Sequence, residues 1–402
     1  MEEWKIYKLK EIGEIVGGAT PSTKNPSNYD GPIPWITPKD LSNSNERYIF
    51  NGERSITNDG YMSCSCKLLP KGTVLFSSRA PIGYVAIAAA PMCTNQGFKS
   101  FIPNSKVDSL FMFYLMKYRK DDIANLGSGT TFIEVSGSVM KEFEVKVPNL
   151  DTQKRIANVL SSLDDKIELN NRINHNLEEQ AQALYKSWFV DFEPFKDGKF
   201  IESELGMIPE GWRVVTMGEV TTEIRTKVGN RTGIKVLSPI NTGKLALSEE
   251  YFTKQVFSNS IAKYILVEPN SFAYNPARVN IGSIGMNEFP FDGCVSPVYV
   301  VFRCEDEYEY LFDFFRKGER FKTEVITRSI GGVRQTLAYK DFSMIKMVYP
   351  PAHIIRNFNS IYHTFYRKIN DLENQNKKIS ELRDSILPKL MSGELKINEI
   401  DC

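Results

Sequence analysis

The chain contains one weak candidate for the acidic and basic residues that a nuclease uses to cleave a phosphodiester. Asp122 followed by Glu144 and Lys146 has a spacing that metal-dependent nucleases can use. The matching part of the second half has Lys346 and Val348 instead, and Glu144 lies in a strand-like alternation. A solvated strand face is therefore a better interpretation of these residues than a nuclease centre.

Other catalytic patterns are equally weak. The segment NPAR at 275–278 matches the Asn-Pro-Pro-aromatic motif of adenine methyltransferases only in part, since it lacks the second proline and the stacking aromatic residue. No GxGxxG or GxxxxGK[ST] sequence follows a predicted strand, so ATP hydrolysis and dinucleotide binding have no support. Cys64 and Cys66 form a C-x-C pair without partner ligands, which is poor evidence for zinc. We expect no catalytic centre and no metal site.

Binding chemistry is better represented, first in a basic loop of the second half. The segment IRTKVGNRTGIK has no acidic residue and contains Arg225, Lys227, Arg231 and Lys235. A basic, turn-rich loop suits contacts to DNA phosphates, and a solvated surface loop is the alternative. We include Lys39 among the candidate DNA-binding residues.

Two arginines recur at the same point of each half, beside a glycine turn. Arg79 precedes Gly83 in SSRAPIGYVAI, and Arg278 precedes Gly282 in NPARVNIGSIGM. Arginine can read guanine through two hydrogen bonds or clamp a phosphate. An internal salt bridge that holds a hairpin is an equally good interpretation of both.

Two glycine-bearing loops add further candidates, GSGTTF at 127–132 and IGGVRQT at 330–336. Their free backbone amides suit phosphates, while glutamine pairs with adenine and arginine with guanine. An ordinary helix-to-strand connection is the competing interpretation. The candidate side chains of these loops are Thr130, Thr131, Arg334 and Gln335.

The candidates recur because the chain runs through one plan twice. Pro148 and Pro350, 202 residues apart, each precede a long helical pattern. Before each proline come short apolar runs that predict strands, and then helices near 105–125 and 306–325. We therefore predict a mixed α/β (α+β) chain with two similar domains, each built on small twisted sheets. The offset between matched points drifts from 199 at the arginines to 202 at the prolines, so the domains share a scaffold and differ in their loops.

The two long helices carry the 4-3 apolar alternation of a coiled coil. We predict that they pair antiparallel within the chain, because this avoids the entropy cost of association; a zipper with another chain is the alternative. Asn174 and Asn376 take matching seam positions and should fix the register. Pro388 cannot continue a helix interior, so this residue favours an end of the second helix near Ile386 or Leu387. The predicted seam positions are Ile156, Leu160, Leu163, Ile167, Asn170, Asn174, Leu177, Ala181 and Leu184 in the first helix, and Phe358, Tyr362, Phe365, Ile369, Leu372, Asn376, Ile379, Arg383 and Ile386 in the second.

Composition narrows the function classes. The chain has 402 residues, enough for two cores, and no apolar run of the roughly 18–20 residues that a membrane span needs. The charged start MEEWKIYKLKEIG does not match a signal peptide, so we expect a cytoplasmic location and no membrane partner. A net charge of +1 is low for a protein that holds nucleic acid unaided, so DNA contacts must use local basic loops or be shared with partner subunits.

The chain resembles the specificity subunit of type I restriction-modification systems almost end to end. KIELNNRINHNLEEQAQALYKSWFVDFEP looks like the family's central conserved region, and LRDSILPKLMSGEL looks like its C-terminal one. SSRAPIGYVAIA and NPARVNIGSIG are similar to its target-recognition domains. The second helix departs from the pattern, since it begins AHIIRNF where the family usually has an entry like Gln153-Lys154-Arg155-Ile156.

The resemblance implies a division of labour. Each target-recognition domain reads one half of an asymmetric, bipartite site on double-stranded DNA, and the helix pair sets the unread spacer. The helices also recruit two modification subunits, which bind S-adenosylmethionine, and restriction subunits that use ATP and magnesium complete the nuclease. No cofactor is expected in this chain itself.

The resulting domain layout has two recognition domains at 1–150 and 209–350. Coiled-coil helices follow at 151–190 and 351–393, with a linker at 191–208 and a tail at 394–402. The rival hypotheses are a standalone DNA-modifying enzyme (an adenine methyltransferase or a nuclease) and a coiled-coil scaffold that binds only protein.

Overall fold

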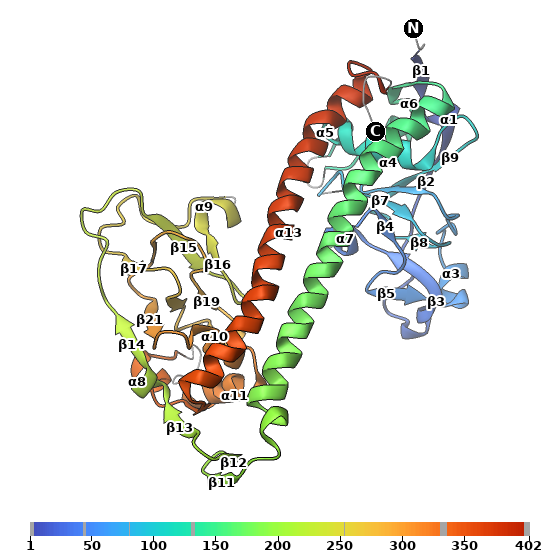
Figure 1. Ribbon diagram of the computed structural model, residues 1–402. Helices are drawn as coiled ribbons and strands as arrows, with labels where there is room; N and C mark the ends of the chain where they lie inside the picture. Colours follow the sequence, from blue (N-terminus) through green and yellow to red (C-terminus); the bar gives the residue numbers. More distant parts are fainter. Residues whose placement is uncertain are drawn as a thin grey trace. The chain divides into compact units, whose positions relative to one another are not determined.

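The computed structural model describes residues 4–42, 46–79, 81–129, 133–252, 254–329 and 336–397 (Figure 1). The chain forms two compact units. Unit 1 comprises Met1–Ile173 and Asp371–Cys402, and unit 2 comprises Asn174–Asn370. Two long helices, α7 (Leu150–Phe189) and α13 (Ala352–Ser392), contribute one part of their length to each unit. Each unit therefore combines a globular head with two helix segments.

Among its described residues, the head of unit 1 contains three small sheets. Their strand orders are β2-β9-β6-β7-β4, β5-β3-β8 and β1-β10. The apolar faces of these sheets and the helix α4 close over a core that includes Val74, Phe76, Phe101 and Phe111. The elements are β1 (Lys5–Lys8), α1 (Leu9–Ile12), β2 (Gly13–Gly17), β3 (Tyr29–Ile36), α2 (Pro38–Ser42), β4 (Tyr48–Ile49), β5 (Arg54–Ile56), α3 (Asn58–Met62), β6 (Val74–Phe76), β7 (Val85–Ala88), β8 (Cys93–Thr94), β9 (Lys99–Pro103), α4 (Ser109–Tyr118), α5 (Lys120–Ala124), α6 (Gly137–Glu142) and β10 (Glu144–Val147).

The described part of the head of unit 2 contains four small sheets. Their strand orders are β14-β21-β18-β19, β16-β15-β20-β17, β13-β22 and β11-β12. The elements are β11 (Phe200–Ser203), β12 (Gly206–Pro209), β13 (Arg213–Thr216), α8 (Met217–Val220), β14 (Thr221–Ile224), β15 (Lys235–Pro239), β16 (Leu245–Leu247), α9 (Ser248–Tyr251), β17 (Ile265–Val267), β18 (Phe272–Tyr274), η3 (Val279–Ile281), β19 (Ile284–Met286), β20 (Gly293–Val295), β21 (Val300–Cys304), α10 (Glu309–Phe315), α11 (Glu319–Arg328), α12 (Tyr339–Phe342) and β22 (Lys346–Tyr349).

Strand pairing confirms that the two heads repeat one plan. The sheet order β2-β9-β6-β7 of unit 1 corresponds to β14-β21-β18-β19 of unit 2, with antiparallel neighbours throughout. β3 pairs parallel with β8, and β15 pairs parallel with β20 in the same way. The helices predicted near 105–125 and 306–325 are each present as two shorter ones, α4 with α5 and α10 with α11.

The helix segments of unit 1 run antiparallel, as predicted. Asp164 on α7 contacts Arg383 on α13, whereas Asn170, further along α7, contacts Asn376, which lies earlier on α13. Every predicted seam position of both helices is buried or half-buried. The 4-3 pattern therefore identified the packed faces correctly, and the pairing lies within one chain.

The helix end near Ile386 or Leu387, which Pro388 favoured, is wrong. α13 continues through Pro388 to Ser392. Helix continuation keeps Leu390 and Met391 buried in the core of unit 1. A proline inside a helix costs about 3 kcal/mol. Burying each large apolar side chain gains about 1.5–3 kcal/mol, so the two together match or exceed that cost.

Aromatic packing holds the helix segments of unit 2 to their head. Tyr185 of α7 stacks on Phe314 of α10 with ring centroids 5.3 Å apart, and Phe189 meets Phe358 of α13 at 4.9 Å. The segment predicted as a linker, residues 191–208, contains β11, most of β12 and the short helix η2 (Glu193–Phe195). Its aromatic side chains Phe192 and Phe195 pack on Trp212.

Candidate nucleic-acid interface

A basic groove with a volume of about 630 Å³ lies in the head of unit 2. The predicted basic loop forms one wall, and the start of α12 with the ends of β17 and β21 forms the others. Four cationic side chains and two tyrosines surround a partly apolar floor. These charged and aromatic lining residues are Arg225, Lys227, Lys263, Lys340, Tyr299 and Tyr339.

The cations of this groove are mostly uncompensated. Arg225 is 80% exposed, and Glu223 is its partner at 2.7 Å. Lys227, Lys263 and Lys340 make no ion pair within the described part of the chain. A concentration of unpaired positive charge beside aromatic rings suits a nucleic-acid backbone.

Arg231 makes hydrogen bonds within the predicted basic loop. Its guanidinium Nη1 donates to the carbonyl oxygens of Lys227 (2.8 Å) and Val228 (3.2 Å) in its own loop. These bonds shape the loop that carries Arg225 and Lys227. Arg231 therefore positions the basic wall of the groove.

Two candidates of unit 1, Lys39 and Arg79, are engaged in ion pairs. Lys39 on α2 pairs with Glu53 at 2.7 Å, and both side chains are about two-thirds exposed. The hydrogen bond that Lys39 donates to Glu53 raises the pKa of this lysine. Arg79 pairs with Glu134 at 2.8 Å, and Lys99 contacts the other carboxylate oxygen at 3.0 Å. For Arg79, the structure favours the internal salt bridge of the two interpretations.

The two recurring arginines do lie at equivalent positions. Arg79 is in the hairpin between β6 and β7, and Arg278 is in the hairpin between β18 and β19. Gly83 and Gly282 both have positive φ, 98° and 89°, where a side chain would be strained. The sequence match between these segments was therefore a true structural repeat.

Other candidates either lie outside the described residues or make local contacts. Thr130, Thr131, Arg334 and Gln335 lie outside the described residues. Asn275, from the partial methyltransferase motif, accepts the backbone N–H of Ala277 at 3.0 Å. Asp122, from the nuclease-like spacing, pairs with Arg119 at 2.5 Å. Among the described residues, no group of three or more His, Cys, Asp or Glu side chains is arranged to hold a metal ion.

The asparagine at 376 joins the helices in unit 1. Asn376 accepts a hydrogen bond from Asn170 and donates one to Asn171, each at 2.8 Å. Asn174 is buried in the part of α7 that belongs to unit 2. The partners of Asn376 were not predicted, although Asn170 was among the seam positions.

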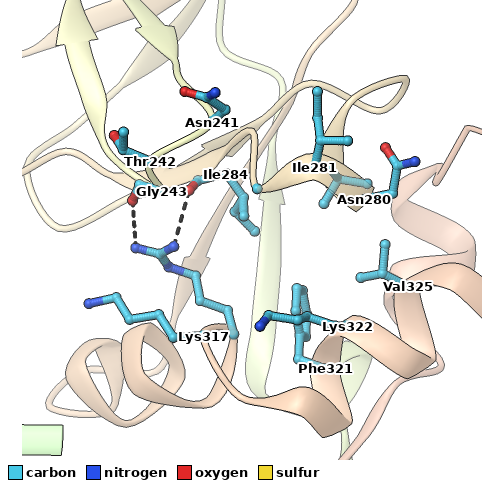
Figure 2. A pocket seen from close by; sticks show the side chains of 13 residues that line it. Asn241, Thr242, Gly243, Asn280, Ile281, Ile284, Lys317, Phe321, Lys322 and Val325 are labelled. Atoms are coloured by element: carbon cyan, nitrogen blue, oxygen red, sulfur yellow. Dashed lines mark hydrogen bonds between the residues drawn. The ribbon is translucent and has the colours of Figure 1, made fainter. Parts of the chain in front are cut away.

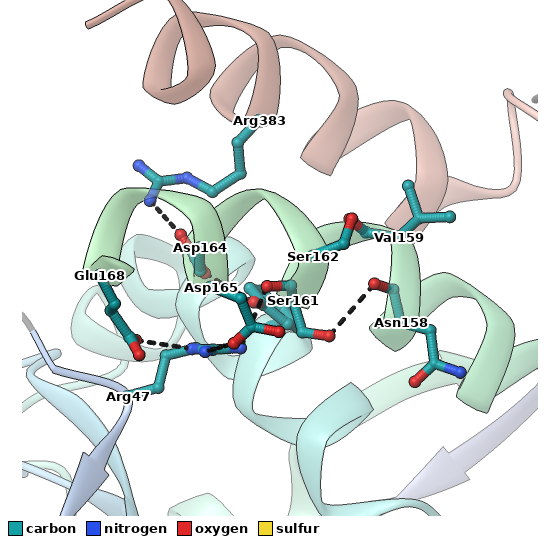
Figure 3. A network of polar contacts seen from close by, with 10 residues as sticks. Arg47, Asn158, Val159, Ser161, Ser162, Asp164, Asp165, Glu168 and Arg383 are labelled. Atoms are coloured by element: carbon teal, nitrogen blue, oxygen red, sulfur yellow. Dashed lines mark hydrogen bonds and ion pairs between the residues drawn. The ribbon is translucent and has the colours of Figure 1, made fainter. Parts of the chain in front are cut away.

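A polar network on α7, which sequence reasoning missed, attaches the head of unit 1 to its helices (Figure 3). Arg47, 5% exposed, pairs with Asp165 and with Glu168 (3.0 Å) on one side of α7. On another side, Asp164 accepts from Arg383 Nη1 and from the Tyr114 hydroxyl, both at 2.6 Å. The only available signal was Arg383 itself, a charged residue at a predicted seam position.

Comparisons with known proteins agree with this architecture. A family model described as "Type I restriction modification DNA specificity domain" matches residues 1–179. The MjaIX specificity subunit of Methanocaldococcus jannaschii is 36% identical over 99% of this chain and 95% of its own length. The HindI specificity subunit of Haemophilus influenzae is 24% identical over 98% of this chain and 100% of its own length.

A solved structure shows the same fold. The S subunit of a type I restriction-modification system from M. genitalium superposes with a TM-score of 0.60 at 16% identity, covering 97% of this chain and 96% of that one. No helix in the described ranges is both long and apolar enough to cross a membrane. Because a relative 36% identical matches almost from end to end, the chain belongs to the family of type I restriction enzyme specificity subunits.

Proposed function

We propose that this chain selects the DNA sequence on which a type I restriction-modification complex acts. The head of each unit reads one half of an asymmetric, bipartite site on double-stranded DNA, and the paired helices set the length of the unread spacer. The observation that carries this proposal is the repeated hairpin, with its positive-φ glycine at the same place in both heads. Two copies of one scaffold with different loops suit two readers of different half-sites.

The chain acts, in this proposal, without a catalytic centre of its own. Asn275 and Asp122, the candidates for catalysis, are engaged in local contacts, which supports a binding role. Two modification subunits supply S-adenosylmethionine chemistry, and restriction subunits supply chemistry that depends on ATP and magnesium. The net charge of +1 supports sharing of the DNA-binding work with such partners.

Methylome sequencing of a host that expresses the whole complex tests this function. The expected result is one bipartite methylated motif with a spacer of constant length. In a second host, two heptads are inserted into 160–184 and matching residues into 362–386, which should lengthen the spacer and leave both half-sites unchanged. A continuous motif, or methyl transfer by the purified chain alone, would refute the proposal. An unchanged spacer in the second host would refute the role of the helices.

A further inference from the structure

The hairpin tip of unit 2 presents three neighbouring side chains to solvent. This tip, residues 275–283 between β18 and β19, buries Val279 at 5% exposure in the core. Arg278 and Asn280 on either side of Val279 are exposed, and Ile281 is 58% exposed. The Arg278 side chain makes no hydrogen bond or ion pair within the described residues. An exposed isoleucine beside an arginine and an amide has no evident role in the packing of this head.

Hydrogen bonds hold the tip in one conformation. The carbonyl oxygen of Arg278 accepts the N–H groups of Ile281 and Ser283, both at 3.1 Å. The buried hydroxyl of Ser283 donates to the carbonyl oxygen of Pro239 at the end of β15, at 2.7 Å. At Gly282, a Cβ atom would lie only 2.7 Å from the carbonyl oxygen of Asn241. The tip is therefore held by internal hydrogen bonds, anchored to β15 through Ser283 and backed by a neighbouring turn.

A buried arginine braces the tip from within. Asn280 and Ile281 neighbour each other at the edge of a hollow of about 350 Å³, which Phe321 and Val325 of α11 also line (Figure 2). Arg316, also lining the hollow, donates to the carbonyl oxygens of Ile284 (3.1 Å) and Gly243 (2.8 Å). These bonds fix the start of β19 against the turn that precedes β16. The exposed side chains consequently stand on a preorganised support, which lowers the entropy cost of binding.

The equivalent tip in unit 1 is used differently. Arg79 is bound to Glu134, whose carboxylate also accepts from Lys99. Burial alone would raise the pKa of Glu134, but the hydrogen bonds from Lys99 and Arg79 outweigh it and lower the pKa. Ile82 is half-buried and packs against the core of unit 1. Within the described residues, the hairpin of unit 1 is thus tied to its own head through Arg79, whereas Arg278 in the hairpin of unit 2 makes no such contact.

We propose that residues 278–281 of unit 2 read base edges in the groove of duplex DNA, whereas the matching tip of unit 1 is structural. This inference rests on the proposed function. It adds the identity of the residues that determine base specificity and the head to which they belong. Arginine pairs bidentately with guanine, asparagine with adenine, and an apolar side chain contacts the thymine methyl group. The neighbouring basic groove, which includes Pro276 of the same hairpin, holds the phosphate backbone. Unit 1 reads its half-site with residues other than Arg79.

The test measures how the assembled complex discriminates between bases. The complex with this chain is incubated with duplexes randomised in one half-site at a time, and bound sequences are counted. Arg278→Ala and Asn280→Ala should each relax preference at one position of one half-site by roughly 10- to 100-fold, as expected for loss of a bidentate contact. Arg278→Lys keeps the charge and loses the planar fork, so it should relax the same position. The other half-site should keep its full preference in all three variants.

Controls separate this proposal from its alternatives. Lys263→Ala removes a phosphate contact and should weaken binding to all sequences alike. Arg79→Ala should leave base preference in both half-sites unchanged. The proposal is wrong if Arg278→Ala weakens all sequences uniformly, if Arg278→Lys retains full discrimination, or if Arg79→Ala relaxes a base position. The wild-type complex reports separately on the proposed function, because a wild-type complex without a bipartite site would refute that function whatever the variants do.

Discussion

Replacing Asp164 by alanine tests whether the buried polar network stabilises unit 1. The Asp164 side chain is 8% exposed and accepts hydrogen bonds from Arg383 and from Tyr114, both at 2.6 Å. Alanine leaves the Arg383 guanidinium, 16% exposed, with Asp384 at 2.8 Å as its remaining ion-pair partner among the described residues. It also leaves the hydroxyl of Tyr114, which is fully buried, without its acceptor.

The expected loss of stability in Asp164→Ala follows from the burial of these side chains. Removing one partner of a buried ion pair costs about 3–5 kcal/mol, because the remaining charge stays desolvated. Asp384 is 61% exposed and still compensates part of the Arg383 charge, so we expect a loss near the lower end, about 3 kcal/mol. For a unit of this size, such a loss lowers the midpoint of thermal unfolding by about 6–12 °C.

Differential scanning calorimetry of the full chain measures this shift. Tyr114→Phe removes one hydrogen bond to the carboxylate and should cost about 1–2 kcal/mol. Lys39→Ala is the matched control, because it breaks an ion pair whose side chains are 67% and 66% exposed, and it should leave the midpoint unchanged. If Asp164→Ala shifts the midpoint no more than Lys39→Ala does, the network does not stabilise unit 1.

Two further predictions concern unit 1. Asn376→Leu should lower the free energy of unfolding by about 1–3 kcal/mol, because it leaves the buried amide of Asn170 unpaired. The double variant Asn170→Leu/Asn376→Leu should recover most of that loss when unfolding in urea is measured. An equal loss of stability in the single and double variants would contradict this reasoning. Glu134→Gln should destabilise the chain at pH 7, since the pKa of Glu134 is lowered in the folded state. A lowered pKa contributes stability above the ordinary glutamate pKa of about 4.3, and this contribution is lost as the pH falls through the folded value. The midpoints of thermal unfolding of the wild-type chain and of Glu134→Gln, measured between pH 7 and pH 3, should therefore converge at low pH. A difference between the midpoints that stays constant over this range would rule out the ionised carboxylate as its cause.

Local patterns in the sequence were enough to predict the internal repeat and the packed faces of the two long helices. The 4-3 alternation depends only on which side chains share one helix face, so it identified the packed positions of α7 and α13 correctly. The match between Arg79 and Arg278 placed both in equivalent hairpins, because the glycine that each turn needs is visible in the sequence. The end of α13 was predicted wrongly, since burial of Leu390 and Met391 matches or exceeds the local cost of Pro388.

The sequence alone thus determined that this chain has two similar heads on two seam-bearing helices, because periodicity and repetition are properties of chain order. Tertiary structure alone decided which charges have partners. Glu134 lies 55 positions from Arg79 in the chain and neutralises it, whereas Arg278 makes no such contact within the described residues. An ion pair depends on the distance between two side chains in space, which the fold sets and sequence separation does not. For the same reason, the contacts of Arg47 with Asp165 and Glu168 became visible only in the folded unit.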